Sequence, residues 1–237
     1  MTDAKIIYLD TRVLRALWKL HLKDWKEADN RRKKAKQLRD ILARGRARNE
    51  LRAMTSPIAV MEMIQFDQSK HYARMRLKKG DDPKDVLDDW HDLPNRWDSG
   101  DDLLERVLGN GSRDLNTWSK STDFDLVDVW HGPWGNKGSP AEVPELLAFA
   151  LRLSLTTPVD EDDCFHVAYM LRYADGILTS DGGLLKALRL TSQVRPIWKR
   201  INNIYLEVFG QAMPESPFRY FTYPGDLKQL TAWSRSP

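Results

Sequence analysis

The stretch PVDEDDCFHVAYMLRYADGILTSD, residues 158–181, is the most informative part of the chain for its fold class. Four consecutive acidic residues near its start are typical of the first turn of a helix, where negative side chains interact favourably with the helix dipole. Apolar residues continue the helix to about Ala174. The apolar run GILT, residues 176–179, then predicts a short buried strand that ends before Asp181. A helix that leads directly into a buried strand indicates an α/β fold with a parallel sheet.

The rest of the chain alternates strand and helix in the same way. KIIYL, residues 5–9, is a nearly continuous apolar run after Lys5, which predicts a second strand buried on both faces and ending at Asp10. From Val13 the apolar residues recur every three or four positions, which predicts a helix whose inner stripe comprises Leu14, Leu17 or Trp18, His21 and Trp25. We expect further helices over residues 31–51, from Ser56-Pro57 to about Gly80, over 142–153 and over 184–188, and a last strand over 194–198.

The charges of the chain are separated along the sequence. Residues 12–52 contain fifteen Lys or Arg and five Asp or Glu, a charge of +10, whereas residues 81–128 contain five and fourteen, a charge of −9. The basic segment is predicted to be helical, with an inner stripe formed by Ala35, Leu38, Ile41 and Leu42. The net charge of +3 therefore hides one surface suited to a polyanion, although two solvated surfaces of opposite sign would give the same count.

Composition excludes several classes of protein. Cys164 is the single cysteine, so the chain has no internal disulfide and no Cys-rich zinc site. The five histidines do not form an H-x-x-x-H pair. The longest apolar stretch, residues 143–155, contains a proline and two charged residues and is too short to cross a membrane, and the N-terminus does not resemble a secretory signal. We therefore expect a cytoplasmic protein with no membrane partner.

Acidic residues stand where two of the predicted strands end. Asp10 and Asp181 occupy these positions, and the ligands of open parallel sheets bind beyond the carboxyl ends of the strands. Asp163 begins the helix that leads into the second strand, and Glu62 lies in the second turn of the helix that starts at Ser56. Four carboxylates at one edge would repel one another unless a hard divalent cation lay between them. Such a site predicts Mg²⁺ or Mn²⁺ and phosphodiester hydrolysis, whereas each acid taken singly could be an ordinary cap or turn residue.

Four short motifs resemble those of PIN-domain nucleases. DCFHVA, residues 163–168, resembles the Asp-x-Leu-His-x-Ala signature of the family, and ILTSD, residues 177–181, resembles its later strand, which ends in Thr-x-Asp. IYLDT, residues 7–11, resembles the first strand with its Asp-Thr ending, and the segment from Ser56 to Glu62 resembles the helix that supplies a glutamate. All four acids of the family pattern have a match in the right order.

The resemblance covers residues 5–64 and 142–198, and it implies a particular fold and domain organisation. The expected fold is a PIN-like α/β/α sandwich with a central parallel sheet, formed by a domain over residues 1–200. The acidic segment 81–140 would be a largely helical insertion in this domain. Residues 201–237 would form a C-terminal extension packed on the core.

The resemblance also implies a set of site residues. One or two Mg²⁺ or Mn²⁺ ions would be held by Asp10, Glu62, Asp163 and Asp181. A metal-activated water would then cleave the phosphodiester, leaving a 5′-phosphate and a 3′-hydroxyl. Hydroxyl groups that orient the carboxylates would come from Thr11, Thr179 and Ser180. Two positions depart from the family pattern: Arg12 stands where small or amide residues are usual, and Gly182-Gly183 stand where some members have a further acid.

The leading interpretation is a metal-dependent endoribonuclease, an activity that small family members use as toxins paired with an antitoxin. A nuclease for DNA or for structured nucleic acid, and a non-catalytic RNA-binding PIN domain, are the alternatives. The densest basic run is expected to contact phosphates and comprises Arg31, Arg32, Lys33, Lys34 and Lys36. His166 is expected to be a packed helix residue. An antitoxin, another protein partner and a homodimer are left open.

Overall fold

A parallel sheet forms the centre of the molecule. The computed structural model describes residues 4–20, 29–56, 58–59, 62, 79–80, 126–129, 142–213 and 219–236. Within these ranges the sheet has five strands in the order β3-β2-β1-β4-β5, and every neighbouring pair is parallel. The strands are β1 (Lys5–Leu9), β2 (Leu51–Thr55), β3 (Val127–Val129), β4 (Gly176–Thr179) and β5 (Arg219–Thr222). The predicted α/β fold with a parallel sheet is therefore confirmed.

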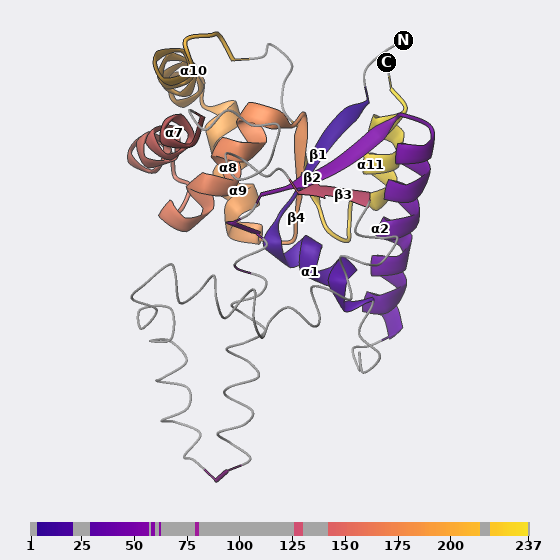
Figure 1. Ribbon diagram of the computed structural model, residues 1–237. Coiled ribbons are helices and arrows are strands. Elements are labelled where there is room, and N and C mark those ends of the chain that lie inside the picture. The colour runs from indigo at the N-terminus through magenta and orange to yellow at the C-terminus, as the bar shows by residue number, and fades with distance from the viewer. Residues whose placement is uncertain are drawn as a thin grey trace.

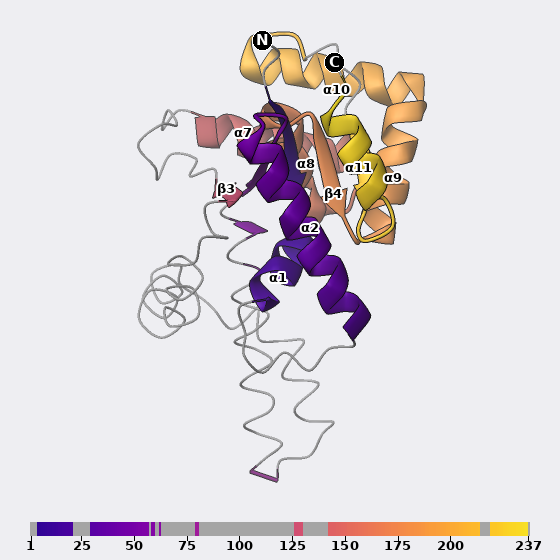
Figure 2. The same ribbon diagram turned by 90° about the vertical axis from the view of Figure 1, so that its right-hand side faces the viewer.

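Helices cover both faces of this sheet (Figure 1). The described helices are α1 (Thr11–Lys19), α2 (Asp29–Ala47), α7 (Glu142–Thr156), α8 (Glu161–Tyr173), α9 (Gly182–Gln193), α10 (Arg195–Phe209) and α11 (Leu227–Ser234). Figure 2 shows α2 and α11 in front of the sheet, and the remaining C-terminal helices lie behind it. No helix in the described ranges combines the length and apolarity that crossing a membrane requires.

Alternate residues of β1 feed two separate hydrophobic clusters, as the pleat of a strand requires. Ile7 and Leu9 pack with α1, α2 and α11 on one face, whereas Tyr8 packs with α7, α8, α9 and α10 on the other. All three side chains are fully buried. A strand covered by helices on both sides has no polar face, which explains why β1 and β4 are continuous apolar runs.

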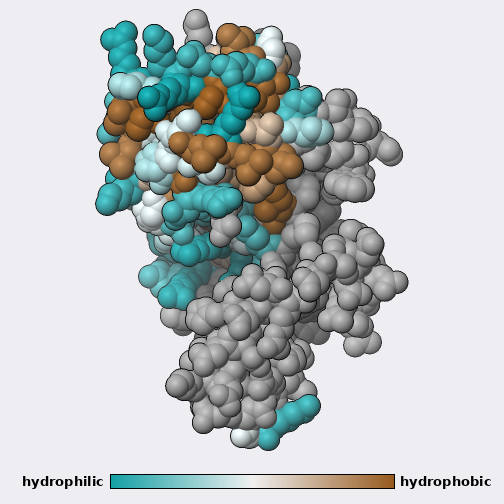
Figure 3. Space-filling model, turned by 90° about the vertical axis from the view of Figure 1, so that its left-hand side faces the viewer, coloured by the Kyte–Doolittle hydropathy of each residue, from teal (hydrophilic) through white to brown (hydrophobic). Residues whose placement is uncertain are grey.

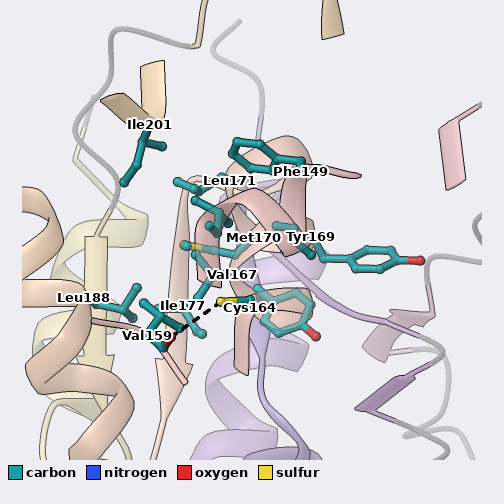
Figure 4. Packing of buried hydrophobic residues seen from close by; sticks show 14 of the residues in the cluster. Phe149, Val159, Cys164, Val167, Tyr169, Met170, Leu171, Ile177, Leu188 and Ile201 are labelled. Carbon is teal, nitrogen blue, oxygen red and sulfur yellow. Dashed lines mark hydrogen bonds between the residues drawn. The ribbon is translucent and has the colours of Figure 1, made fainter. Parts of the chain in front are cut away.

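The second cluster also buries the single cysteine. Cys164 lies among apolar side chains of α8 and its neighbours, with its thiol Sγ 3.7 Å from the carbonyl oxygen of Val159 (Figure 4). Burial, followed by the charges of Asp163 and Glu161, raises the pKa of the Cys164 thiol to about 12. The thiol is therefore protonated near neutral pH and is unsuited to act as a nucleophile.

The predicted helix over residues 31–51 is wrong at its C-terminal end, because α2 stops at Ala47 and Leu51 opens strand β2. Asn49 adopts a left-handed conformation, with φ of 53°, and turns the chain back. Gly45 allows this return: a Cβ atom there would lie 2.6 Å from the Cβ of Leu51. The inner stripe of α2 is as predicted, since its four apolar residues are buried: Ala35, Leu38, Ile41 and Leu42.

The predicted last strand over residues 194–198 is also wrong. Only Val194 is extended, and it separates α9 from α10, which has Pro196 in its first turn. The strand that completes the sheet is β5, from the segment 201–237 that we expected as a C-terminal extension. Gly176 permits this pairing, because a Cβ atom on it would lie 2.6 Å from the carbonyl oxygen of Arg219.

Other expectations are met in part by the described residues. The helices predicted over residues 142–153 and 184–188 correspond to α7 and to the longer α9. The expected helix after Ser56 is described only at residues 58–59 and 62, which are helical. The insertion 81–140 lies outside the described residues except for 126–129, which include β3.

The outer helices carry exposed apolar side chains. Figure 3 shows apolar surface on the face of the molecule where α7 and α10 lie. Large exposed hydrophobic residues on these two helices are Leu147, Leu151, Leu155 and Leu206. The three leucines of α7 are four residues apart, so they form a stripe along one side of the helix.

Candidate carboxylate site

Asp10 connects β1 to α1 at the carboxyl edge of the sheet. Its Oδ1 accepts a hydrogen bond from the backbone N–H of Val13 at 2.8 Å, which caps the helix, and its Oδ2 accepts one from the hydroxyl of Thr179. The Asp10 residue is only 5% exposed. Burial raises the pKa of the Asp10 carboxyl, and the hydrogen bonds from Thr179 and Val13 offset part of that rise.

Asp181 occupies the corresponding position after β4. Its Oδ1 caps α9 by accepting hydrogen bonds from the backbone N–H groups of Gly183 and Leu184, at 2.8 and 3.0 Å. The small residue pair after Asp181 therefore forms the first turn of a helix. The Asp181 Oδ2 lies 3.1 Å from Nη2 of Arg12, and the backbone N–H of Asp181 donates to the Thr179 hydroxyl at 2.9 Å.

Glu62 approaches the same edge from a different part of the chain. The Thr11 hydroxyl donates a hydrogen bond to Oε2 of Glu62. Nε2 of His166 lies 3.1 Å from Oε2 and 3.2 Å from Oε1. Burial would raise the pKa of the Glu62 carboxyl, but the hydrogen bond and positive charge of His166, with the hydrogen bond from Thr11, lower it below its ordinary value.

Asp163 lies in the first turn of α8, one turn before His166. Burial raises the pKa of the Asp163 carboxyl to about 6, and the negative charges of Asp181, Asp160 and Glu62 add to the rise against the opposing effect of His166. No described residue donates a hydrogen bond to this carboxylate. We call Asp10, Glu62, Asp163 and Asp181 the carboxylate cluster, because shared contacts and mutual charge effects link all four.

The three hydroxyl residues expected to orient these acids act in different ways. Thr11 donates to Glu62 and Thr179 donates to Asp10, so both side chains hold a predicted ligand as expected. Ser180 acts on Asp10 through its backbone N–H, which lowers the pKa of the Asp10 carboxyl. Among the described residues, the Ser180 hydroxyl therefore makes no hydrogen bond to a carboxylate, and the predicted role of this hydroxyl is not met.

His166 is buried on α8, as predicted, but it does more than pack. Its Nδ1 lies 2.7 Å from the hydroxyl oxygen of Tyr8, which in turn lies 2.7 Å from Oγ of Ser56. Burial would lower the pKa of His166, but the hydrogen bond and charge of Glu62, with the charges of Asp10 and Asp163, raise it. The contact between His166 and Tyr8 was not predicted, because it joins two elements that are far apart in the sequence. The sequence did contain one signal that His166 lies near the site: its i, i+3 spacing from Asp163 places both residues on one face of a helix.

The carboxylate cluster fits a hard divalent cation in its donor chemistry and its place in the fold. Every donor is a carboxylate oxygen, and Asp163 has no described hydrogen-bond donor. As the side chains stand, however, no three His, Cys, Asp or Glu residues among those described lie close enough to hold one ion. Asp181 faces Arg12 and the α9 backbone, and Asp10 faces Thr179 and the α1 backbone, so their oxygen atoms point to other partners.

The predicted basic run lies on α2, which packs against the first cluster by its buried stripe. The exposed members of the run are Arg31, Arg32, Lys33 and Lys36, and Lys34 is half-buried. Figures 1 and 2 show that the N-terminal end of α2, which carries the run, lies near α1 at the end of the molecule where β1 finishes. The run therefore shares that end of the molecule with the carboxylate cluster.

No protein-family model, no curated protein and no solved structure matches this chain significantly.

Proposed function

We propose that this protein is a metal-dependent endoribonuclease of the PIN type, with Asp10, Glu62, Asp163 and Asp181 as the ligands of one or two Mg²⁺ or Mn²⁺ ions. The observation that carries the proposal is that four acids stand at one edge of a parallel sheet, after β1, after β4, in α8 and at position 62, and that shared hydrogen-bond partners and mutual charge effects link them. This edge is where α/β proteins with open sheets bind their ligands. The order of the acids along the chain also agrees with the motifs that resemble the family.

The chain's own groups prepare the cluster for this chemistry. Thr11 and His166 hold Glu62 from two sides, and Thr179 holds Asp10. When bound, a hard divalent cation would lower the pKa of a water ligand and offset charge at the phosphorus. Burial, followed by the negative charges of neighbouring acids, raises the pKa of Asp163, so ionising this carboxyl costs free energy, and a bound cation would offset that cost.

The proposed reaction is the hydrolysis of one phosphodiester bond. The water oxygen bonds to phosphorus while the bond from phosphorus to O3′ breaks, and the departing O3′ takes up a proton. The products are a 5′-phosphate and a 3′-hydroxyl. The basic run Arg31–Lys34 of α2 and Lys36 would contact phosphates along the RNA, which gives affinity but no sequence specificity.

A non-catalytic RNA-binding PIN domain is the second candidate, and one observation favours it. Asp181 is paired with Arg12, and among the described residues no three donors lie within reach of one ion. A domain that had lost its cation would keep the basic run and the fold. The two candidates differ in whether bound RNA is cut.

The test measures cleavage of single-stranded RNA and DNA by the full-length protein with Mg²⁺ or Mn²⁺. We expect metal-dependent cleavage of RNA, and we expect Asp10→Asn and Asp163→Asn to lower the rate by at least about 100-fold, because a lost cation costs several kcal/mol of transition-state stabilisation. Glu207→Gln is the matched control, since this acid pairs with Arg152 on the outer helices, away from the cluster.

Each outcome of this experiment favours one candidate. Equal rates for the wild type and both Asn variants would contradict the proposed site. Cleavage of DNA as well as RNA would favour a DNA or structure-specific nuclease. RNA that is bound but cut with neither metal would favour the binding domain.

A cytoplasmic toxin neutralised by an antitoxin is the cellular role that we propose, and it rests on the family resemblance alone. Induced expression should then arrest growth, and Asp163→Asn should remove the arrest. Growth that is unaffected by the wild-type protein would argue against a toxin without touching the nuclease proposal. An antitoxin and a homodimer stay predictions.

A further inference from the structure

A chain of hydrogen bonds runs through the buried centre of the protein to the carboxylate cluster. It starts at the backbone N–H of Ala59, which donates to Ser56 Oγ at 3.2 Å, and passes through the Tyr8 hydroxyl and the His166 ring to Glu62. Ser56 and Tyr8 are fully buried, and His166 is 4% exposed. Glu62, by contrast, has 36% of its side chain exposed, so the chain ends where solvent and ligands can reach.

Packing does not explain this arrangement. Burying a hydroxyl or an imidazole costs free energy unless each polar atom finds a partner, and an apolar side chain of similar size would fill the same space without that requirement. Here each member is satisfied, with contacts of 2.7 Å from Ser56 to Tyr8 and from Tyr8 to His166. A fully satisfied buried network fixes the orientation of its members.

The direction of the hydrogen bonds follows from the Glu62 end. An ionised carboxylate only accepts hydrogen bonds, so Nε2 of His166 carries the proton and donates it to Glu62. Nδ1 of His166 then accepts from the Tyr8 hydroxyl when the ring is neutral and donates to the Tyr8 oxygen when the ring is protonated, and in both states Nε2 donates to Glu62. The contact with Tyr8 at Nδ1 thus fixes the rotation of the ring, which sets the position of the Nε2 donor toward Glu62.

We infer that His166, held in place by Tyr8, is a positioning residue that fixes the Glu62 carboxylate for cation binding. The inference rests on the proposed function, since it takes Glu62 as a cation ligand. Thr11 holds the carboxylate from α1 and His166 holds it from α8. Two donors on different elements fix the carboxylate more tightly than one, in the way that hydrogen-bond partners of metal ligands usually do.

The experiment measures Mn²⁺ affinity of the full-length protein by calorimetry, with the RNA cleavage rate as a second readout. His166→Leu removes the donor and should weaken Mn²⁺ binding by about 10- to 100-fold. His166→Gln keeps an N–H donor near the place of Nε2 and should restore binding to within about threefold of the wild type, because the donor and not the ring is what matters.

Two tyrosine variants complete the test. Tyr8→Phe removes only the hydroxyl that holds the ring, so it should weaken Mn²⁺ binding by a smaller factor than His166→Leu. Tyr205→Phe is the matched control: Tyr205 is also fully buried, but its hydroxyl accepts from Arg172 and not from the cluster network. Its Mn²⁺ affinity should equal that of the wild type.

The results separate this inference from the proposed function. A wild-type protein that binds Mn²⁺ while His166→Leu and Tyr8→Phe bind it equally well would overturn the inference and leave the proposed function intact. A wild-type protein that binds no Mn²⁺ would overturn the proposed function. Should His166→Leu fail to fold, Tyr8→Phe and His166→Gln still decide, because weakened binding in the first and retained binding in the second are the expected pair.

Discussion

Arg12 brings a positive charge to the carboxylate cluster at the position where the chain departs from the family pattern. Its side chain is 65% exposed and pairs with Asp181 at 3.1 Å. Exposed ion pairs contribute little free energy, so a divalent cation can displace the guanidinium from Asp181. The departure from the pattern is therefore compatible with a cation site, but it should weaken the binding of the ion.

Replacing this arginine should tighten metal binding. Arg12→Gln removes a group that competes with the cation for Asp181 and that also carries the same sign of charge as the cation. Together these two effects are worth about 0.5–1 kcal/mol of binding free energy. We therefore expect Mn²⁺ to bind about two- to fivefold more tightly to Arg12→Gln, as measured by calorimetry. Arg152→Gln, which removes a remote arginine paired with Glu207, should leave the affinity unchanged. Weaker Mn²⁺ binding by Arg12→Gln would show that the arginine supports the site.

Asp163 should make the protein less stable as the pH rises. Its pKa is about 6 in the folded state, above that of an unfolded aspartate, so the folded state binds more protons between about pH 4 and 6. The free energy of unfolding therefore falls as the pH rises through this window. Asp163→Asn removes the effect.

The comparison is made in buffer that contains a metal chelator, so that no divalent cation is bound. At pH 8 the free energy of unfolding of Asp163→Asn should be about 1 kcal/mol higher than that of the wild type. This value allows for solvent screening of the half-buried carboxyl. Urea denaturation at pH 8 and pH 4.5 measures the difference, which should shrink at the lower pH. The control variant is Asp40→Asn, at an exposed acid on α2. A wild type more stable than Asp163→Asn at pH 8 would contradict the reasoning.

Helix α2 combines a buried apolar stripe with a basic outer surface. The stripe fixes which side of the helix faces the core. The basic run lies at the N-terminal end of α2, which is at the end of the molecule that carries the carboxylate cluster (Figure 1). A helix oriented in this way offers an electrostatic surface for a polyanion beside the sheet edge that carries the carboxylate cluster.

If the protein binds RNA as proposed, neutralising the run should flatten the salt dependence of that binding. Each phosphate contact on single-stranded nucleic acid contributes about 0.7 to the slope of log affinity against log salt concentration. Replacing residues 31–34 with Gln should lower the slope by roughly 1 to 3 and weaken binding at low salt. The control is the double variant Arg44→Gln and Arg48→Gln, at the other end of the basic segment. An unchanged slope after replacement of residues 31–34 would show that these residues do not contact the RNA.

The sheet joins segments from both ends of the chain into one core. β5 pairs with β4, and α11 packs its buried residues Leu227 and Leu230 against the same cluster as β1. Lys5 reinforces this connection, because its Nζ donates to the carbonyl oxygen of Trp233 at 2.9 Å. The described C-terminal residues are thus part of the folding unit that holds the site.

Truncating a core residue of α11 should destabilise the whole protein. Leu230 is fully buried, and Leu230→Ala should lower the free energy of unfolding by about 2–4 kcal/mol through lost burial and the cavity that remains. Urea denaturation followed by tryptophan fluorescence and by circular dichroism should show one transition at a lower midpoint. Lys228→Ala, on the exposed side of the same helix, should change stability by less than about 0.5 kcal/mol, and a similarly small effect of Leu230→Ala would contradict this.

Local sequence was sufficient for the features that depend on neighbouring residues. The apolar runs of β1 and β4, the stripe of α2 and the acids that follow the strands could all be read from spacing, because burial on two faces and helix capping act over a few residues. The ends of elements were harder to predict: the turn at Asn49 and the interruption at Val194 are single-residue events that periodicity does not reveal.

Contacts between distant segments required the folded chain. The pairing of β4 with β5, the contact of Glu62 with His166 across 104 residues and the pairing of Arg12 with Asp181 leave no periodic signal, because they depend on which elements pack side by side. The sequence thus placed three acids, Asp10, Asp163 and Asp181, at strand ends or helix starts, because these features are local, and it placed Glu62 in the second turn of a predicted helix. Their partners, and the directions in which their oxygen atoms point, follow from packing between elements that lie far apart in the chain.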